Sequence, residues 1–218
     1  MKAANRLAVL ALSMLFGNSL CAQGAPNPAP AAIPDPAKSA WAYNLTVDGY
    51  IVSHGQSYVD PVFTANRKWL HLEARYNYEN LRTGSLWVGF NFRVGKTLVL
   101  DFAPMIGGVF GRTNGIAPGC EASLTYKKIQ ASIVNEYVFD TTTKAGNFYF
   151  SWPQVTYSPV GWFRVGAVAQ HTKAYQTAFS IQRGFLIGFS HKKWEFTTYV
   201  LDPFIGDTVT ILELGVNF

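Results

Sequence analysis

From residue 41 to the C-terminus, apolar and polar side chains alternate in repeating units of about 9 to 13 residues that end in turn clusters. In segment 69–79 the apolar positions are Leu70, Leu72, Ala74, Tyr76 and Tyr78, and the residues between them are polar or charged. Segments 85–94 and 211–218 repeat the pattern. A period of two predicts β-strands, so we expect this part of the chain to be all-β.

The N-terminus has the features of a secretory signal peptide over residues 1–24. Lys2 and Arg6 precede an apolar run at 7–16, and small residues follow at Ala22 and Gly24, after either of which we predict cleavage. The apolar run is too short for a helix that spans a membrane. Residues 25–40 are rich in proline and alanine and predict an extended linker.

Alternation alone fits a soluble sandwich as well as a membrane barrel, but three features favour the barrel. One is the signal peptide. Another is the set of aromatic residues expected on the apolar face near strand ends, as in an interfacial girdle: Tyr76, Tyr78, Tyr126, Tyr137, Phe139, Phe148, Phe150 and Trp152. The third is the last strand, which ends in Phe218 and resembles the C-terminal signal of Gram-negative outer-membrane barrels.

We therefore predict an all-β fold for residues 41–218, a transmembrane antiparallel up-and-down β-barrel in the bacterial outer membrane. The resemblance of the last strand implies contact with outer-membrane lipid and recognition by the barrel assembly machinery through Phe218.

The strand number follows from the order of the connections, because such barrels have short inner turns and longer outer loops. Counting back from Phe218, the predicted outer loops are 202–207, 172–176, 140–146, 107–118 and 79–84. The predicted inner turns are 190–193, 158–161, 126–128, 95–96 and 66–68. Strands at 41–52 and 57–65 complete about twelve; ten would follow if Pro61 makes the latter segment a loop.

The composition excludes several classes of protein. The 18 basic and 13 acidic residues give a net charge of +5, and the pI is near 9.2, but no basic cluster or stripe indicates nucleic acid. Charged residues make up only 14% of the chain, as expected when one face of each strand meets lipid. Cleavage would leave Cys120 as the single cysteine, and the four histidines are scattered, so we predict no disulfide, metal site or cofactor.

Charged residues cannot face lipid without a large penalty, so we expect those within strands to line the lumen. The predicted lumen-lining residues for a pore are Asp48, Glu73, Arg75, Arg93, Asp101, Glu136 and Arg164, and Glu121, Glu195 and Glu213 share the inward parity. Paired charges in a filled lumen and a solvated path for polar solutes both fit this set, since twelve strands lie between filled and open barrels.

Two features do not follow directly from the alternation. Arg183 shares the parity of lipid-facing neighbours, and a slip at Gly184 or a bulge would turn it inward. The glycine-rich loop predicted at 107–118, with Arg112 and Asn114, would be either a mobile surface loop or a constriction folded into the mouth.

Segments 70–79, 107–119 and 157–159 resemble a family of small proteobacterial outer-membrane barrels. The resemblance implies a fold and a location, and it carries over no catalytic residues. Three functions remain open: a narrow, weakly selective pore for small polar solutes, a structural or surface-interaction barrel with a filled lumen, and an outer-membrane hydrolase. For the hydrolase, the candidate catalytic set is His71 with Ser85 or Asp101. We favour the two functions without catalysis over the enzyme.

Overall fold

The computed structural model describes residues 40–53, 55–174, 180–204 and 208–218. The predicted signal peptide (1–24) and all but the last residue of the predicted linker (25–40) lie outside this range, so both remain predictions. Within the described residues, no helix is long and apolar enough to cross a membrane.

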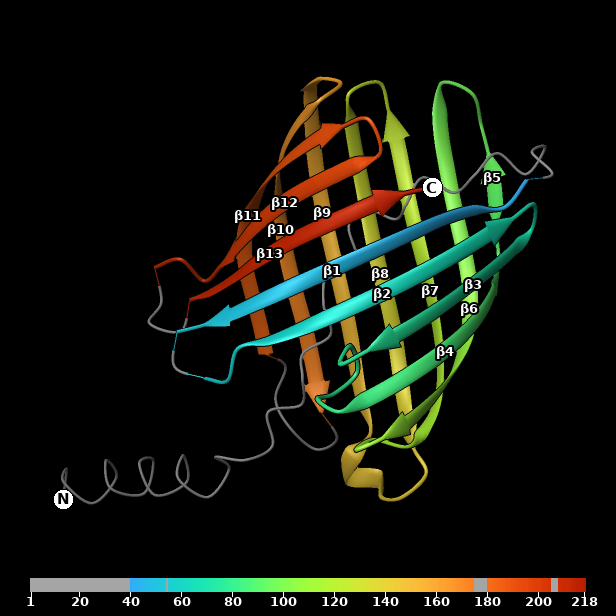
Figure 1. Cartoon of the computed structure of the whole chain (residues 1–218), viewed down its shortest axis with the longest axis vertical. Helices are drawn as coiled ribbons and strands as arrows, with labels where there is room; N and C mark the ends of the chain where they lie inside the picture. The colour runs from blue at the N-terminus through green and yellow to red at the C-terminus, as the bar shows by residue number, and fades with distance from the viewer. Residues whose placement is uncertain (1–39, 54, 175–179, 205–207) are drawn as a thin grey trace, which may run out of the picture.

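Strands make up nearly all of the regular structure (Figure 1). They are β1 (Ala42–Val52), β2 (Tyr58–Arg67), β3 (Leu70–Tyr76), β4 (Thr83–Phe90), β5 (Phe92–Val94), β6 (Leu98–Gly111), β7 (Gly115–Tyr126), β8 (Ile129–Asp140), β9 (Phe148–Val160), β10 (Phe163–Ala174), β11 (Ser180–His191), β12 (Trp194–Leu201) and β13 (Val209–Asn217). A short 3₁₀ helix, η1 (Lys144–Gly146), lies between β8 and β9.

The strands form one closed antiparallel barrel. Each strand pairs with its neighbours in the chain, except that β4 and β5 both pair with β6 and not with each other, and β1 pairs with β13. Strands β4 and β5 are separated only by Asn91, so together they act as one strand of the barrel, and the thirteen segments form twelve barrel strands. The predicted up-and-down barrel of twelve strands is confirmed, and the alternative of ten is excluded.

The two ends of the barrel differ in the length of their connections. At the end that holds the start of β1 and the end of β13, which we call the inner end, Tyr43 and Phe218 exchange backbone hydrogen bonds of 2.9 and 3.0 Å. Tight turns join strands there, with positive φ at Lys68, Lys127 and Lys192, as tight hairpin turns require. The other, outer end carries longer connections at 77–82 and 141–147, which confirms the outer loops predicted at 79–84 and 140–146. The outer loops predicted at 172–176 and 202–207 lie partly outside the described residues.

The predicted long loop at 107–118 is wrong. Strands β6 and β7 remain paired up to Val109 and Gly115, and only residues 112–114 form the turn. Asn114 closes this turn, because its amide side chain exchanges hydrogen bonds with the backbone of Gly111. The glycines that suggested a loop instead allow close packing: a Cβ on the inward Gly107 would lie 2.4 Å from the Trp87 ring.

Two other irregularities have simpler causes than the sequence suggested. Pro61 pairs with Val47 in an unbroken β1–β2 register, and it lies just beyond the last β2–β3 pair, Val62 with Arg75. The register of β10 and β11 runs without a shift through Arg183, so the predicted slip or bulge is wrong. Arg183 is exposed near the outer end, where its backbone exchanges hydrogen bonds with Asp202.

The outward face is apolar around the barrel. Exposed large apolar side chains occur on most strands, for example Leu86 on β4, Ile106 on β6 and Phe185 on β11. The inward face is polar or aromatic and almost entirely buried. This inversion, with apolar side chains outside and charges inside, is the arrangement of a barrel surrounded by lipid.

We expect Gly107→Ala to destabilise the barrel by about 1–3 kcal/mol, because the new methyl group would overlap the Trp87 ring. The matched control is Gly108→Ala on the same strand, where a Cβ meets nothing within 4 Å. Urea unfolding of both variants in lipid vesicles measures the difference, and equal stability would contradict the packing role of Gly107.

Candidate functional site: the charged lumen

The structure places the predicted lumen-lining residues on the inner wall. Asp48, Glu73, Arg75, Asp101 and Glu136 are buried, with at most 4% of their surface exposed. Arg93 and Arg164 also point inward but keep 33% and 15% of their side-chain surface exposed.

Arg75 on β3 is the centre of the largest ionic network. Its Nε lies 2.5 Å from Glu73 Oε2, and its Nη1 lies 2.9 Å from Glu136 Oε2 on β8. Its guanidinium also lies 4.3 and 4.4 Å from the ring centres of Tyr78 and Trp87. Because β3 and β8 are not neighbours in the sheet, the contact with Glu136 crosses the lumen.

The connection between β3 and β4 folds into the barrel. Tyr78 and Glu79 have no exposed surface, and Glu79 Oε1 accepts hydrogen bonds from Ser85 Oγ at 2.5 Å and Trp87 Nε1 at 3.2 Å. At the end of this segment, Asn80 Nδ2 donates to Thr113 Oγ1 at 3.0 Å. The sequence predicted a loop that could constrict the mouth at 107–118, but the segment that enters the lumen is 77–82.

Aromatic and aliphatic side chains fill the outer half of the lumen. Tyr78 packs edge-on against Phe150, with ring centres 5.9 Å apart, and Trp152 packs in the same way against Tyr199 at 5.7 Å. Phe148 is buried beside them in the same cluster. Four predicted girdle residues, Tyr78, Phe148, Phe150 and Trp152, therefore face inward, whereas Tyr76, Tyr126 and Phe139 are exposed as predicted. The error arose because β9 carries large apolar side chains on both faces.

The inner half is more polar and more accessible to water. Arg93 Nε lies 2.9 Å from Asp101 Oδ1. Arg164 lies 3.6 Å from Glu195 and 3.5 Å from Glu213, and donates to Thr197 Oγ1 at 2.7 Å. Since Glu195 keeps 31% of its side-chain surface exposed, solvent reaches this group.

His71 takes part in the lumen network rather than in the set considered for a hydrolase. Its Nε2 lies 2.7 Å from Glu73 Oε1 and its Nδ1 lies 2.8 Å from Asn66 Oδ1. Ser85 is bound to Glu79, and Asp101 to Arg93. One ligand atom each from His71, Glu73 and Glu121 lies within 4.8 Å of the others, a spacing that the scattered sequence positions did not reveal. Glu73 is nevertheless already engaged by Arg75.

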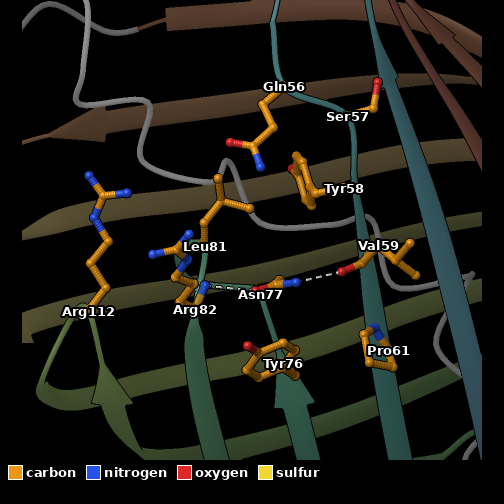
Figure 2. A pocket seen from close by; sticks show the side chains of 10 residues that line it. All are labelled: Gln56, Ser57, Tyr58, Val59, Pro61, Tyr76, Asn77, Leu81, Arg82 and Arg112. Atoms are coloured by element: carbon orange, nitrogen blue, oxygen red, sulfur yellow. Dashed lines mark hydrogen bonds between the residues drawn. The ribbon is translucent and has the colours of Figure 1, made fainter.

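A separate pocket of about 580 Å³ lies at the outer end, where β3 stops at Tyr76 while β2 continues to Tyr58 (Figure 2). Asn77 joins the two strands there, because its Nδ2 donates to the carbonyl of Val59 at 2.8 Å. Arg82 and Arg112 lie together along one side of this pocket. It contains Arg112 of the predicted outer loop and none of the predicted lumen-lining residues.

Two acidic residues of the inner wall, Asp60 and Glu79, were missed by the sequence reasoning. Asp60 was missed because Pro61 obscured the alternation of β2, although Tyr58, Asp60 and Val62 do share one parity. Glu79 was missed because its segment was assigned to an outer loop. Glu79 does share the parity of Glu73 and Arg75 in segment 69–79, but β3 ends at Tyr76, so its place in the lumen depends on the fold of 77–82.

No protein-family profile matches the sequence, and no curated protein matches it. Among solved structures, the chain is similar to a KdgM porin, with a TM-score of 0.55, 10% identity, and coverage of 80% of this chain and 99% of that one. For a KdgM porin in complex with disordered oligogalacturonate the TM-score is 0.56 and the identity 8%, and the match covers 80% of this chain and 99% of that one. For OccK3 of Pseudomonas aeruginosa the TM-score is 0.44 and the identity 9%, and the match covers 78% of this chain and 60% of that one. The KdgM likenesses show that this chain shares the β-barrel fold of those two structures.

We expect Arg75→Met to lower the free energy of unfolding by about 3–5 kcal/mol, because it leaves Glu73 and Glu136 buried without their cation. The control is Arg82→Met, since Arg82 is exposed and should change stability by less than about 0.5 kcal/mol. Urea titration in lipid vesicles, followed by tryptophan fluorescence, compares the two. An equal effect of both substitutions would show that Arg75 does not organise the lumen.

Proposed function

We propose that this protein is an outer-membrane channel for small polar solutes, closed in the state described here. The observation that carries the proposal is the inverted distribution of side chains: the inner wall has charged residues on β1, β3, β6, β8, β10 and β13. A path for polar solutes needs such a wall. The porin fold and the accessible inner half around Arg164 and Glu195 support the same function.

The segment 77–82 is the gate in this proposal. Below the mouth, the lumen is filled by the side chains of Tyr78, Glu79 and Arg75. Neither Tyr78 nor Glu79 has any exposed surface. Side-chain contacts to Ser85, Trp87 and Thr113 hold Glu79 and Asn80. Backbone hydrogen bonds tie the two ends of the segment, Asn77 to Thr83 and Arg82 to Arg112. The middle of the segment can therefore leave the lumen while its ends stay attached to the barrel.

A structural or surface-interaction barrel with a filled lumen is the second candidate. The near-complete burial of the Arg75 network favours it, because a side-chain plug of this kind would hold a permanently closed barrel. The two functions differ in a single property, ionic current across a membrane. The hydrolase is less favoured, since His71, Ser85 and Asp101 each have other partners.

The proposed location and partners are those of an outer-membrane protein. Residues 1–24 would direct export, residues 25–40 would act as a spacer, and the apolar outer face would contact lipid. The barrel assembly machinery would recognise the last strand, with Phe218 as its terminal residue. The structurally similar KdgM porin was solved in complex with oligogalacturonate. The acidic side chains of the lumen described here would repel such a carboxylate-bearing sugar.

In planar bilayers we expect small current steps from the refolded barrel, and steps at least about twofold larger from the double variant Tyr78→Ala/Glu79→Ala, because two fully buried side chains that fill the lumen are shortened. Phe204→Ala, at a side chain that is 94% exposed on the β12–β13 connection, is the control and should leave the steps unchanged. If neither the natural barrel nor the double variant carries current above the lipid background, the channel is rejected in favour of the filled barrel.

Deletion of Phe218 should lower the amount of folded barrel in the outer membrane of Gram-negative cells severalfold. The deletion removes the proposed recognition residue, together with its backbone pair and its stacking on Tyr43, with ring centres 6.0 Å apart. Comparison with the yield of refolding in detergent separates recognition from stability. Normal assembly in cells would refute the role of Phe218, and an equal loss in detergent would assign it to stability alone.

A further inference from the structure

The lumen has a strong excess of acidic groups. Among the described residues, the buried acidic side chains are Asp48, Asp60, Glu73, Glu79, Asp101, Glu121, Glu136 and Glu213. They are eight of the 13 acidic residues in the chain, and Arg75 is the one arginine in the same buried set. The partly exposed Arg93, Arg164 and Glu195 leave the balance negative.

Three of these carboxylates form a row on adjacent strands. Asp60 on β2 is directly opposite Asp48 on β1, and Asp48 is directly opposite Glu213 on β13. Directly opposite residues on one face of a sheet have Cβ atoms about 4.5–5.5 Å apart, and like charges at this distance destabilise the pair. All three side chains have no exposed surface.

The middle carboxylate of the row, Asp48, has no hydrogen-bond partner in the protein. Arg164 lies 3.5 Å from Glu213, whose other oxygen accepts from Tyr199 Oη at 2.9 Å. Neither oxygen of Asp48 has a hydrogen-bond partner, although this carboxylate lies between the two others. A buried, unpartnered carboxylate between two like groups requires a cation or a proton.

We propose that Asp48, Asp60 and Glu213 form a binding site for a hard divalent cation, Ca²⁺ or Mg²⁺, and that this site makes the channel prefer cations over anions. Carboxylate oxygens are the ligands that such cations bind in proteins. The preference for cations rests on the proposed channel function, whereas the binding site itself does not.

Access to the row is from the inner end. Glu213 adjoins Arg164, which is accessible to water together with Glu195. On the other side, the stacked rings of Tyr50 and Tyr58, with centres 4.4 Å apart, follow the row on the same two strands and close it toward the outer end. The His71, Glu73 and Glu121 group is the less suitable site, because the Arg75 guanidinium already pairs with Glu73.

Calcium titration of the refolded barrel in detergent, by calorimetry and by thermal unfolding, tests the site. We expect saturable binding and a rise in Tm with Ca²⁺, as for any ligand that binds the folded state. Asp48→Asn should weaken binding at least about tenfold and abolish the rise in Tm. Its Tm without Ca²⁺ should not be below that of the natural protein, because the substitution removes repulsion.

The control is Asp101→Asn, which removes a lumen carboxylate that pairs with Arg93 outside the row and should change calcium affinity less than about twofold. Retained binding in Asp48→Asn, or no binding by the natural barrel, overturns the proposal and assigns protons to the row. Unchanged heat-modifiable mobility in gels verifies that each variant is folded.

The reversal potential of single channels in a salt gradient tests the cation preference. We expect a cation preference that falls in the triple variant Asp48→Asn/Asp60→Asn/Glu213→Gln. Calcium binding without any current would reject the channel and keep the site. Current without calcium binding and without a cation preference would reject the site and keep the channel.

Discussion

The structure depends on one constraint, which is that no backbone polar group and no charged side chain can face hydrocarbon without a large penalty. Pairing of β1 with β13 removes the last open edge, and the mutual hydrogen bonds of Tyr43 and Phe218 end that seam. Closure of the sheet creates a single interior, and every charge within a strand must then enter it or lie near an end, as Arg183 does. The charged lumen is therefore a consequence of the membrane before it is a feature of any function.

What the chain does with this interior is specific to its sequence. A barrel of twelve strands encloses a wider interior than a barrel of about eight strands, whose interior is filled by side chains of the strands alone. Here the outer half is filled by an aromatic cluster and by the 77–82 segment, and the Arg75 guanidinium connects the two through Tyr78, Trp87 and Glu136. The buried middle of this segment is held by side-chain hydrogen bonds, whereas its two ends are tied by backbone hydrogen bonds of Asn77 with Thr83 and of Arg82 with Arg112. The side-chain contacts that close the lumen can therefore be released while the ends stay attached to the barrel.

The alternation of side chains predicted most of the fold and the site because it acts directly on closure. It gave the strand number, the order of turns and loops, and the inward direction of residues such as Asp48, Arg75 and Glu136. It failed where one face no longer differed from the other. Strand β9 has large apolar groups on both faces, so Phe150 and Trp152 were assigned outward. The glycine-rich end of β6, in which Gly107 makes room for Trp87, was taken for a loop. Tyr78 and Glu79 could not be placed, since nothing local specifies that a connection folds inward.

The distribution of charge carries information that the total charge hides. The chain is basic, with 18 basic and 13 acidic residues, yet eight of the acidic ones are buried in the lumen, whereas lysines at the inner turns, such as Lys127 and Lys192, are exposed. Exposed charges in water are screened within about 10 Å at 0.1 M salt, and buried ones much less. An ion inside this barrel therefore responds to the carboxylates rather than to the net positive charge. The net charge of the chain and the charge of its lumen have opposite signs because they describe different surfaces of one closed sheet.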